Sequence, residues 1–552
     1  MSSRAFRSSS VALLLVLAAR AWSATYCVDL SDSSCDVNDM GSAGVASALA
    51  AAAQTADDDT IKIGAGTYLG PYTYMPSGDA GTLTIIGSGS DKTTVSVPVP
   101  GSFGPILWLA RDAVGHAANV SKLAIVIPSS AIIGVQTDGL VEDARITSVP
   151  PNGGAFGVEL FGTGSGIRRC QIEMSNVPQS TGVESDPGNT LSLDPAPAFI
   201  EDSSVIDGVA TVRAFAPLRM TRCRVSANGN GSLAIAARGT NVTVEDSLIL
   251  VGGGGAFALR AASEMGPGSL LVRQVTAVSV GATQALAGIS VDAEGPDASA
   301  DVRHSIIRGF KNSTARTAVM NASATVSFSA CDYPFDAHLV QGPGNTTLTE
   351  PEPNIDADPL FVDALGGNYE LSDGSPAIDA SYSPPIAPGE SPTDLLGAPR
   401  IQDGNGDGIA ARDMGAFEHP GPSTTTTTTI SAVTTTTIGT VTTTAPPATT
   451  TTLPCTTARC LFDAALHGPA CAGVDVPKKI ITKIDGAVGL ADRAGTSSGK
   501  KQRRLLARAR QTLDVIGRAA AHASKGRKPH ISSVCSEAIS GAARTLRSEL
   551  NP

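Results

Sequence analysis

The sequence predicts an all-β parallel β-helix solenoid, followed by a Thr-rich linker and a small disulfide-stapled α-helical bundle. A short string of apolar and small residues recurs through the middle of the chain at intervals of 20 to 33 residues, which is typical of stacked repeats. The chain is rich in glycine, with 58 among 552 residues, and only 16% of it is charged, which favours turn-rich β structure. Residues 455–552 instead show helical periodicity.

Residues 1–23 have the features of a secretory signal peptide. Arg4 and Arg7 precede an apolar run from Val11 to Ala19, and Ala21-Trp22-Ser23 fits a small-x-small cleavage site. The run is shorter than the roughly 20 residues that a membrane-spanning helix needs, and no later segment comes closer. We therefore expect a secreted or surface-displayed protein without a transmembrane span.

Residues 24–350 are predicted to form the β-helix, with a helix near Gly44–Ala53 covering its open N-terminal end. The recurring string has the form apolar-x-x-small-x-apolar. It reads Val141-Glu-Asp-Ala-Arg-Ile146, Ile167-Arg-Arg-Cys-Gln-Ile172, Ile200-Glu-Asp-Ser-Ser-Val205, Met220-Thr-Arg-Cys-Arg-Val225 and Val244-Glu-Asp-Ser-Leu-Ile249, with weaker copies from Val272, Val302 and Val326.

The string also predicts where its side chains point. The first apolar residue faces inward, the next points out, the third turns the corner, and the small fourth residue points inward. Cys170 and Cys223 both occupy the small position and are separated by the coil of Ser203. Two coils of about 4.8 Å each exceed the reach of a disulfide, so we expect buried free thiols there and at Cys331.

The other cysteines are predicted to form disulfides, because export exposes the chain to an oxidising environment. Cys27 and Cys35 form a local pair. Cys455, Cys460, Cys471 and Cys535 form an even set with three possible connectivities. Zinc is the alternative for these four, but their spacing lacks a C-x2-C knuckle.

With these repeats, residues 25–350 resemble the secreted right-handed parallel β-helix proteins of the pectin-lyase-like superfamily. The resemblance implies a right-handed solenoid and specifies activity poorly. Residues 351–420 resemble the bacterial choice-of-anchor Q domain, which implies a closing segment and a surface-associated protein. The motifs that carry this second resemblance are Asp358-Pro-Leu-Phe361, Gly367-Asn-Tyr369, Ser375-Pro-Ala-Ile-Asp379, Asp394-Leu-Leu-Gly397 with Pro399-Arg400, and Asp413-Met-Gly-Ala-Phe-Glu418.

The C-terminal part consists of a linker over residues 421–454 and a helical domain over residues 455–552. Thr accounts for 18 of the 30 residues from Thr424 to Leu453, a composition that cannot bury a core. The helical domain carries 17 Lys and Arg against 7 Asp and Glu, whereas the rest of the chain carries 23 against 44. We expect a solvated basic surface that contacts a cell-surface component, with nucleic acid the less favoured partner.

Acidic residues supply the candidate catalytic sites. Superfamily enzymes use paired Asp residues or a calcium site with a basic residue, so the resemblance draws attention to Glu142-Asp143, Glu201-Asp202 and Glu245-Asp246. Their recurrence at one place in the repeat favours a structural role, and no polygalacturonase-type motif series is present. The densest titratable cluster comprises Asp292, Glu294, Asp297, Asp301, Arg303 and His304, for which a solvated turn is the alternative.

Calcium is the cofactor that the sequence suggests. Asp403, Asn405 and Asp407 occupy positions 1, 3 and 5 of a loop that resembles an EF-hand, and Gly408 occupies position 6. Asp413 falls at position 11, where the pattern requires an acid at position 12. An Asx-rich turn without calcium is the alternative.

Taken together, these features predict a binding or structural protein whose long face binds an extracellular polysaccharide. The alternative is a polysaccharide lyase or related carbohydrate-active enzyme acting on the same solenoid. Aromatic platforms for sugars are few, since Trp108 is the only Trp beyond the signal peptide, and Tyr68, Tyr72 and Tyr74 are typical strand packing residues.

Overall fold

A computed structural model describes residues 23–421 with short gaps and part of the C-terminal region. The gaps are 31, 77, 79, 99–103, 113, 129–132, 150–153, 163, 175–179, 188–195, 207–209, 265, 382–385 and 387. The C-terminal region is described at 476–495, 499–523 and positions 462, 466, 471, 531, 535, 536, 539, 543 and 546. The chain divides into two compact units after residue 428. Apart from Ser23, the predicted signal peptide lies outside the described residues.

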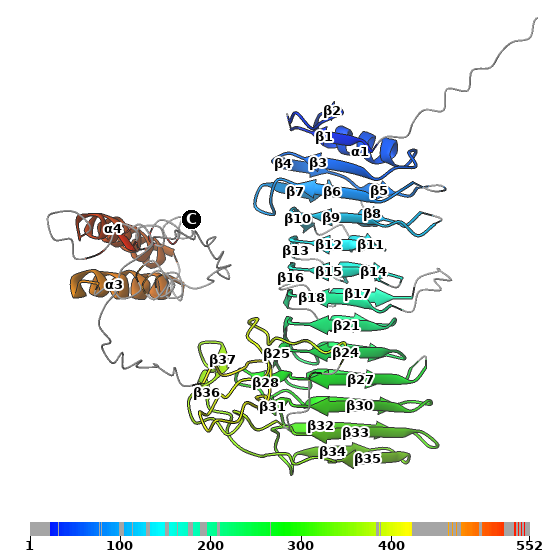
Figure 1. Cartoon of the computed structure of the whole chain (residues 1–552), viewed down its shortest axis with the longest axis vertical. Helices are drawn as coiled ribbons and strands as arrows, with labels where there is room; N and C mark the ends of the chain where they lie inside the picture. The colour runs from blue at the N-terminus through cyan, green and yellow to red at the C-terminus, as the bar shows by residue number, and fades with distance from the viewer. Residues whose placement is uncertain are drawn as a thin grey trace, which may run out of the picture. The chain divides into compact units, whose positions relative to one another are not determined.

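The first unit is a parallel β-solenoid with three sheets, named A, B and C here (Figure 1). The 14 strands of sheet A are β1 (Thr25–Val28), β2 (Val37–Asp39), β3 (Asp59–Ile63), β6 (Leu83–Gly87), β9 (Ala118–Ser121), β12 (Leu140–Glu142), β15 (Gly166–Arg168), β18 (Ala198–Glu201), β21 (Leu218–Thr221), β24 (Asn241–Glu245), β27 (Gly268–Arg273), β30 (Ala298–Arg303), β33 (Ser323–Ser329) and β35 (Asn345–Thr349).

The other two sheets share the same coils. The 10 strands of sheet B are β4 (Gly66–Leu69), β7 (Thr93–Ser96), β10 (Ala124–Ile127), β13 (Arg145–Ser148), β16 (Gln171–Glu173), β19 (Ser204–Ile206), β22 (Arg224–Asn228), β25 (Leu248–Gly252), β28 (Thr276–Val280) and β31 (Ile306–Arg308). The 11 strands of sheet C are β5 (Tyr72–Tyr74), β8 (Pro105–Leu109), β11 (Ile133–Thr137), β14 (Phe156–Phe161), β17 (Thr181–Asp186), β20 (Ala210–Ala214), β23 (Leu233–Arg238), β26 (Phe257–Ala262), β29 (Ala287–Ala293), β32 (Asn312–Ala318) and β34 (His338–Gln341).

Consecutive strands pass from sheet A to B to C, so each coil contributes one strand to each sheet. From β3 to β32 this order repeats through ten coils. The recurring string of the sequence spans the end of a sheet A strand and the start of the next sheet B strand. The structure therefore confirms the predicted parallel β-helix, while its right hand stays a prediction.

The core of the solenoid consists of apolar rows that run from coil to coil. Val141 pairs with Ile167, which pairs with Ile200, and this sheet A row continues from Val120 to Val302. Its members are almost fully buried. Stacking like side chains at about 4.8 Å removes their apolar surface from water, and this burial holds neighbouring coils together.

The corner between sheets A and B explains the rest of the string. Asp143, Arg169, Asp202 and Arg222 each occupy the third position and adopt φ near 50°, a left-handed conformation that turns the chain. The fourth position points inward, where the Ser203 hydroxyl accepts the N–H of Cys170 at 3.1 Å. Small polar residues thus satisfy backbone donors that the corner leaves unpaired. Cys170, Cys223 and Cys331 are buried free thiols, as predicted.

Helix α1 (Gly41–Ala52) covers the N-terminal end of the solenoid. Its buried side chains include Val45, Ala48 and Leu49, and it contacts strands β1 to β5. The Cys27–Cys35 disulfide lies at the same end, with a Cα–Cα distance of 5.7 Å, so this predicted pairing is confirmed.

Residues 351–421 lie along the side of the solenoid, next to β25, β28 and β31 (Figure 1). Their only regular structure in the described part is the antiparallel pair β36 (Phe361–Asp363) and β37 (Asn368–Leu371). Phe417 and Tyr369 pack against Leu248 of sheet B. The Arg400 guanidinium is completely buried and donates to the Asp246 carboxylate at 2.7 Å. This segment therefore covers the outer face of sheet B, whereas the resemblance implied a closing element.

The second unit contains helix α3 (Lys478–Gly495) and helix α4 (Gly499–Ala523), which pack against each other. Ile480, Ile484 and Val488 of α3 share a buried cluster with Leu513 and Ile516 of α4. A disulfide joins Cys471 to Cys535, with a Cα–Cα distance of 4.6 Å. Cys455 and Cys460 lie outside the described residues. No described helix is long and apolar enough to cross a membrane.

Candidate functional site

The six residues of the predicted Asp292–His304 cluster lie on different surfaces. Asp292 and Glu294 contact Arg260 on the outer face of sheet C, at 2.5 and 3.7 Å. Asp301 pairs with Arg303 at 2.6 Å on sheet A. The Asp297 side chain accepts the N–H of Ser323 at 2.8 Å in a turn.

His304 turns the corner between sheets A and B at φ 51°, beneath the segment 351–421. Its carbonyl accepts the N–H of Gly415 at 2.8 Å. Burial, followed by the charge of Arg412, lowers the pKa of His304 to about 4. The structure therefore does not assemble one site from the six residues, and the sequence proximity of the cluster reflects successive faces of one coil.

The recurrent acidic pairs on sheet A are structural. Glu142 and Glu201 both reach Arg168, at 3.5 and 3.0 Å. Asp143 pairs with Arg169 at 2.7 Å. These contacts join neighbouring coils.

The same pattern continues along the solenoid. Asp202 pairs with Arg222 at 2.6 Å, and the completely buried Glu245 contacts Arg219 at 2.7 Å and also Arg273. Each of these acids thus lies beside an Arg of an adjacent coil, and we call this series of pairs the sheet A ion ladder. The predicted structural interpretation of these acids agrees with their contacts.

The predicted calcium loop binds its own backbone. The two Asp403 carboxylate oxygens accept the N–H groups of Gly406 and Gly408 at 2.8 and 2.9 Å, and Asn405 accepts the N–H of Asp407 at 2.8 Å. The Asp407 carboxylate accepts the N–H of Ile409 in the same way. These contacts are those of Asx turns, so calcium at this loop stays a prediction.

Asp413, the last residue of that predicted set, points elsewhere. It is buried and accepts the N–H groups of Asp379 and His419 at 2.7 and 2.5 Å. Burial raises the pKa of Asp413 to about 6. Its hydrogen bonds hold together three parts of the segment 351–421.

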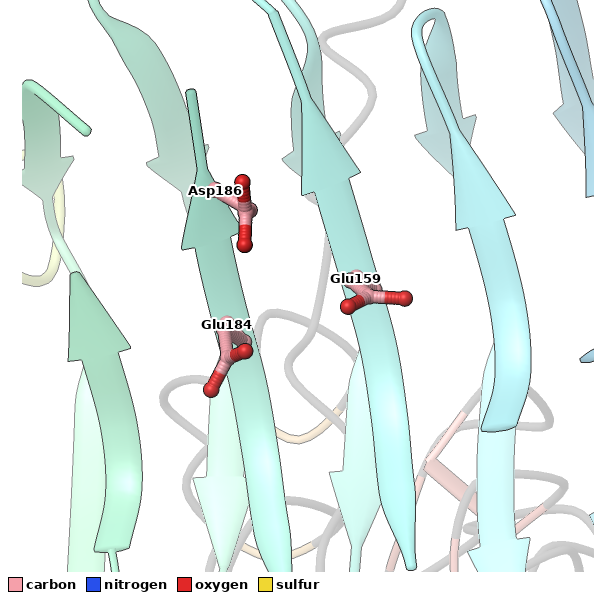
Figure 2. Close-up of side chains that lie close together, drawn as sticks. All are labelled: Glu159, Glu184 and Asp186. Carbon is pink, nitrogen blue, oxygen red and sulfur yellow. The ribbon is translucent and has the colours of Figure 1, made fainter. Parts of the chain in front are cut away.

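The outer face of sheet C holds an acidic cluster that the sequence analysis did not single out. Glu159 of β14 lies directly beside Glu184 of β17 in the strand register, and Asp186 follows two residues later on the same face (Figure 2). One carboxylate oxygen from each residue lies within 4.8 Å of the others. We call these three residues the acidic cluster. Oxygen donors at this spacing are of the kind that a hard cation such as calcium accepts.

Mutual repulsion and burial perturb the acidic cluster. The pKa of Glu159 is raised to about 7, first by burial and then by the charges of Glu184 and Asp186. The pKa of Glu184 is also raised by burial, and its ion pair with Arg213 works in the opposite direction. Burial and the neighbouring carboxylates therefore disfavour the ionised form of Glu159.

An arginine between two aromatic rings borders the acidic cluster. Arg213 of β20 occupies the register position next to Glu184 and forms an ion pair with it. Its guanidinium lies 5.5 Å from the Phe156 ring centroid and 5.4 Å from that of Phe215. Arg238 approaches the Phe215 ring at 5.4 Å. This part of sheet C thus offers carboxylates, guanidinium groups and aromatic rings on consecutive coils.

A second repeat in the sequence marks this site. Gly134-Val-Gln136, Gly157-Val-Glu159 and Gly182-Val-Glu184 fall on three consecutive coils of sheet C. A Cβ on Gly157 would approach the Gly182 carbonyl oxygen to 2.5 Å, so the glycines allow close backbone packing. The repeat could have revealed that Glu159 and Glu184 share a register position.

The predicted aromatic candidates have other roles. Tyr68, Tyr72 and Tyr74 are buried beneath the N-terminal end and pack there, as strand tyrosines do. Trp108 of β8 is half-buried and pairs in register with Gln136, which pairs with Glu159. Trp108 therefore belongs to the same outer row of sheet C as the acidic cluster, two coils away.

Comparisons with known proteins give likenesses to solved structures at low sequence identity. No family model and no curated protein matches the chain, so the choice-of-anchor Q assignment stays a prediction. Pectate lyase Pel9A is 13% identical, with 72% of this chain and 97% of that chain covered and a TM-score of 0.34. Alginate lyase from Paenibacillus sp. str. FPU-7 is also 13% identical, covering 58% of this chain and 99% of that chain at a TM-score of 0.25.

The A-module of the Azotobacter vinelandii mannuronan C-5 epimerase AlgE4 is 12% identical, with 57% of this chain and 96% of that chain covered and a TM-score of 0.24. Such identities concern the fold alone. The strand order of this chain by itself defines the class of its fold, a parallel β-solenoid.

Proposed function

We propose that this protein binds an extracellular polysaccharide on the outer face of sheet C, over strands β14, β17 and β20. The observation that carries the proposal is the placement of the acidic cluster beside Arg213, which lies between Phe156 and Phe215. These side chains come from consecutive coils, so they form a strip along the solenoid. A linear polymer could contact several coils at once.

The chemistry of this strip suits sugars. Hydroxyl groups both donate and accept hydrogen bonds, and ionised carboxylate and guanidinium groups form the stronger charge-assisted kind. Aromatic side chains provide large rigid surfaces against which the apolar faces of sugar rings can pack.

The proposal places the protein outside the cell. The predicted signal peptide and the Cys27–Cys35 and Cys471–Cys535 disulfides support export. The exposed Lys478, Lys479 and Lys483 of α3, with Lys501, Arg504 and Arg508 of α4, support contact of the second unit with an anionic cell-surface component.

One observation favours the alternative, a polysaccharide lyase or related carbohydrate-active enzyme. A carboxyl group whose pKa is about 7 can accept or donate a proton at neutral pH, and Glu159 has this pKa within a cluster of carboxylates. The same residues would then act on the polymer that they bind.

Retention and cleavage measured together separate the two functions. The full secreted chain would be tested against uronate-rich and neutral polysaccharides, with and without calcium. The double variant Glu159→Gln/Arg213→Gln is compared with Glu142→Gln, which removes an acid from sheet A instead. Binding is supported if the wild type is retained by a polysaccharide without cleaving it, and if the double variant is retained at least about tenfold less.

New reducing or unsaturated ends that depend on Glu159 would establish the enzyme instead. Retention that Glu142→Gln weakens as much as the double variant would show that sheet C is not the binding face. If the wild type neither binds nor cleaves any of the polysaccharides, both proposed functions are wrong.

A further inference from the structure

The two ends of the solenoid differ in how their strand edges are protected. At the N-terminal end, α1 lies over β4 and β5, and its Ser42 hydroxyl accepts the N–H of Leu69 at 2.8 Å. The remaining edge strand there, β2, has three residues, includes Asp39 and follows Asp36. Short length, charge and a covering helix are the usual devices that prevent edge strands from pairing with other chains.

The C-terminal end lacks these devices in the described part of the chain. Sheet A ends at β35, whose five residues, Asn-Thr-Thr-Leu-Thr, contain no charge, proline or bulge. Among the described residues, none pairs with the outer edge of β35. Val340 of β34, the last strand of sheet C, is 52% exposed, and Phe335 is 42% exposed. Uncharged edge strands rich in β-branched residues favour pairing.

The hydrogen bonds of β35 show which of its backbone groups remain free. The Asn345 N–H donates to Ala322 at 3.0 Å, which directs Asn345, Thr347 and Thr349 towards β33 in the alternating pattern of a parallel pair. The N–H and C=O groups of Thr346 and Leu348 therefore point away from β33, along the open edge.

We propose that the open edge of β35 pairs antiparallel with β35 of a second copy of this chain, forming a twofold end-to-end dimer. In the register centred on Thr347, Thr346 of one copy exchanges both of its hydrogen bonds with Leu348 of the other, and the reverse pair does the same. This arrangement satisfies four N–H groups with four carbonyls. The interface is isologous, as a twofold dimer requires.

The side chains and charges of β35 are compatible with this register. Thr346 and Leu348 are half-buried and face the solenoid interior, where Leu348 already packs against the core, so each copy would extend the inner row of the other. Asn345, Thr347 and Thr349 are exposed on the outer row. No like charges meet within the pairing strands. Pairing of two β2 edges would instead bring Asp36 and Asp39 of both copies together.

The inferred register places Thr347 opposite itself across the twofold axis. Residues in such a non-hydrogen-bonded antiparallel pair have Cα atoms about 4.5 Å apart. That distance lies within the range of disulfides, about 4.4 to 6.8 Å. Thr347→Cys should therefore form a dimer linked by a single disulfide under mild oxidation.

The matched control is Thr325, which pairs in register with Thr347 on β33 and lies on the same outer row one coil further in. Sedimentation of the full chain at about 1 to 100 μM should show a dimer in equilibrium with monomer, the range for a small interface. Thr347→Lys should weaken dimerisation by about tenfold or more, because it places two ammonium groups at the axis. Thr325→Lys should leave the dimer in place.

Thr346→Pro removes an outward N–H at a position where an edge strand tolerates proline, and it should also give monomers. A wild-type chain that stays monomeric throughout this range would overturn the proposal. A dimer that Thr347→Lys does not weaken, or that Thr325→Lys weakens equally, would do so too. If the lysine variants misfold by circular dichroism, crosslinking decides: Thr347→Cys dimers without Thr325→Cys dimers support the interface, and equal crosslinking rejects it.

Discussion

The outer faces of sheets A and C are built by the same coils but use charge differently. On sheet A, acid and arginine alternate over three consecutive coils, so Glu142, Arg168 and Glu201 neutralise one another. On sheet C, two acids occupy the same register position on adjacent coils, with Asp186 beside them. In a solenoid, the register thus determines whether an acid lies beside an arginine or beside another acid on the next coil.

Removing the charge of Glu245, the buried acid of the sheet A ion ladder, should lower the free energy of unfolding more than any other change considered. Glu245→Gln leaves Arg219 and Arg273 without the completely buried carboxylate between them. Removing one partner of a buried ion pair leaves an uncompensated charge, so we expect the free energy of unfolding to fall by about 3 kcal/mol. Urea denaturation at pH 7 measures this loss. A change below about 1 kcal/mol would show that solvent compensates the arginines.

The same kind of substitution on sheet C, Glu159→Gln, should raise the free energy of unfolding instead of lowering it. The pKa of Glu159 rises from its ordinary value of 4.5 to about 7 in the folded chain, so the folded state holds its proton more tightly than the unfolded state. Stability from this group is therefore fully present at low pH and is lost as pH rises from about 4.5 through 7.

Glu159→Gln should accordingly match the wild type at pH 4 and exceed its free energy of unfolding by about 1–2 kcal/mol at pH 8, a figure reduced for solvent screening. The measurement is urea denaturation at both pH values in EDTA, with Glu142→Gln as the control. The control loses ion pairs and should gain nothing at pH 8. Equal pH dependence of wild type and Glu159→Gln would contradict the electrostatics of the acidic cluster.

Phe215 and Phe199 allow the cation–π contacts of sheet C to be compared with those of sheet A. Two arginine guanidinium groups, those of Arg213 and Arg238, lie over the Phe215 ring, whereas Arg168 alone lies over Phe199 of sheet A. Each cation–π contact contributes about 0.5–1 kcal/mol, so Phe215→Ala should lose about twice as much from these contacts as Phe199→Ala. Polysaccharide retention should fall only for Phe215→Ala. Thermal denaturation and retention, measured on both variants, test the two expectations.

Local and register-dependent features differ in how well the sequence predicts them. The string around Val141–Ile146 recurs because the corner between sheets A and B sets the same requirements for four consecutive residues on successive coils. The first faces inward, the second faces outward, the third adopts a left-handed backbone conformation, and the fourth is small. Such a pattern is visible in the sequence, and it predicted the solenoid, the buried Cys170 and Cys223, and the structural role of Glu142.

The acidic cluster depends instead on which coils become neighbours. Glu159 is 25 residues from Glu184 and 27 from Asp186, so no local stretch of the sequence contains all three acids. Only the register brings them together, and the Gly-Val-Glu repeat was its single local signal. Conversely, Asp301 and His304 are only three residues apart in the sequence, but Asp301 lies on sheet A whereas His304 lies at the corner where the coil turns. Sequence proximity overestimates spatial proximity at such corners.

The smallest change in the free energy of unfolding is expected when an exposed ion pair of sheet A is removed. Asp143 turns its corner at φ 50° and pairs with Arg169 at 2.7 Å near solvent. Asn tolerates the left-handed conformation as well as Asp, so Asp143→Asn tests the ion pair alone and should cost about 0.5 kcal/mol. Asp143→Val should cost more, since a β-branched residue is strained at positive φ. Urea denaturation of the two variants separates backbone from charge. If Asn costs as much as Val, the ion pair rather than the corner conformation explains why Asp occupies this position.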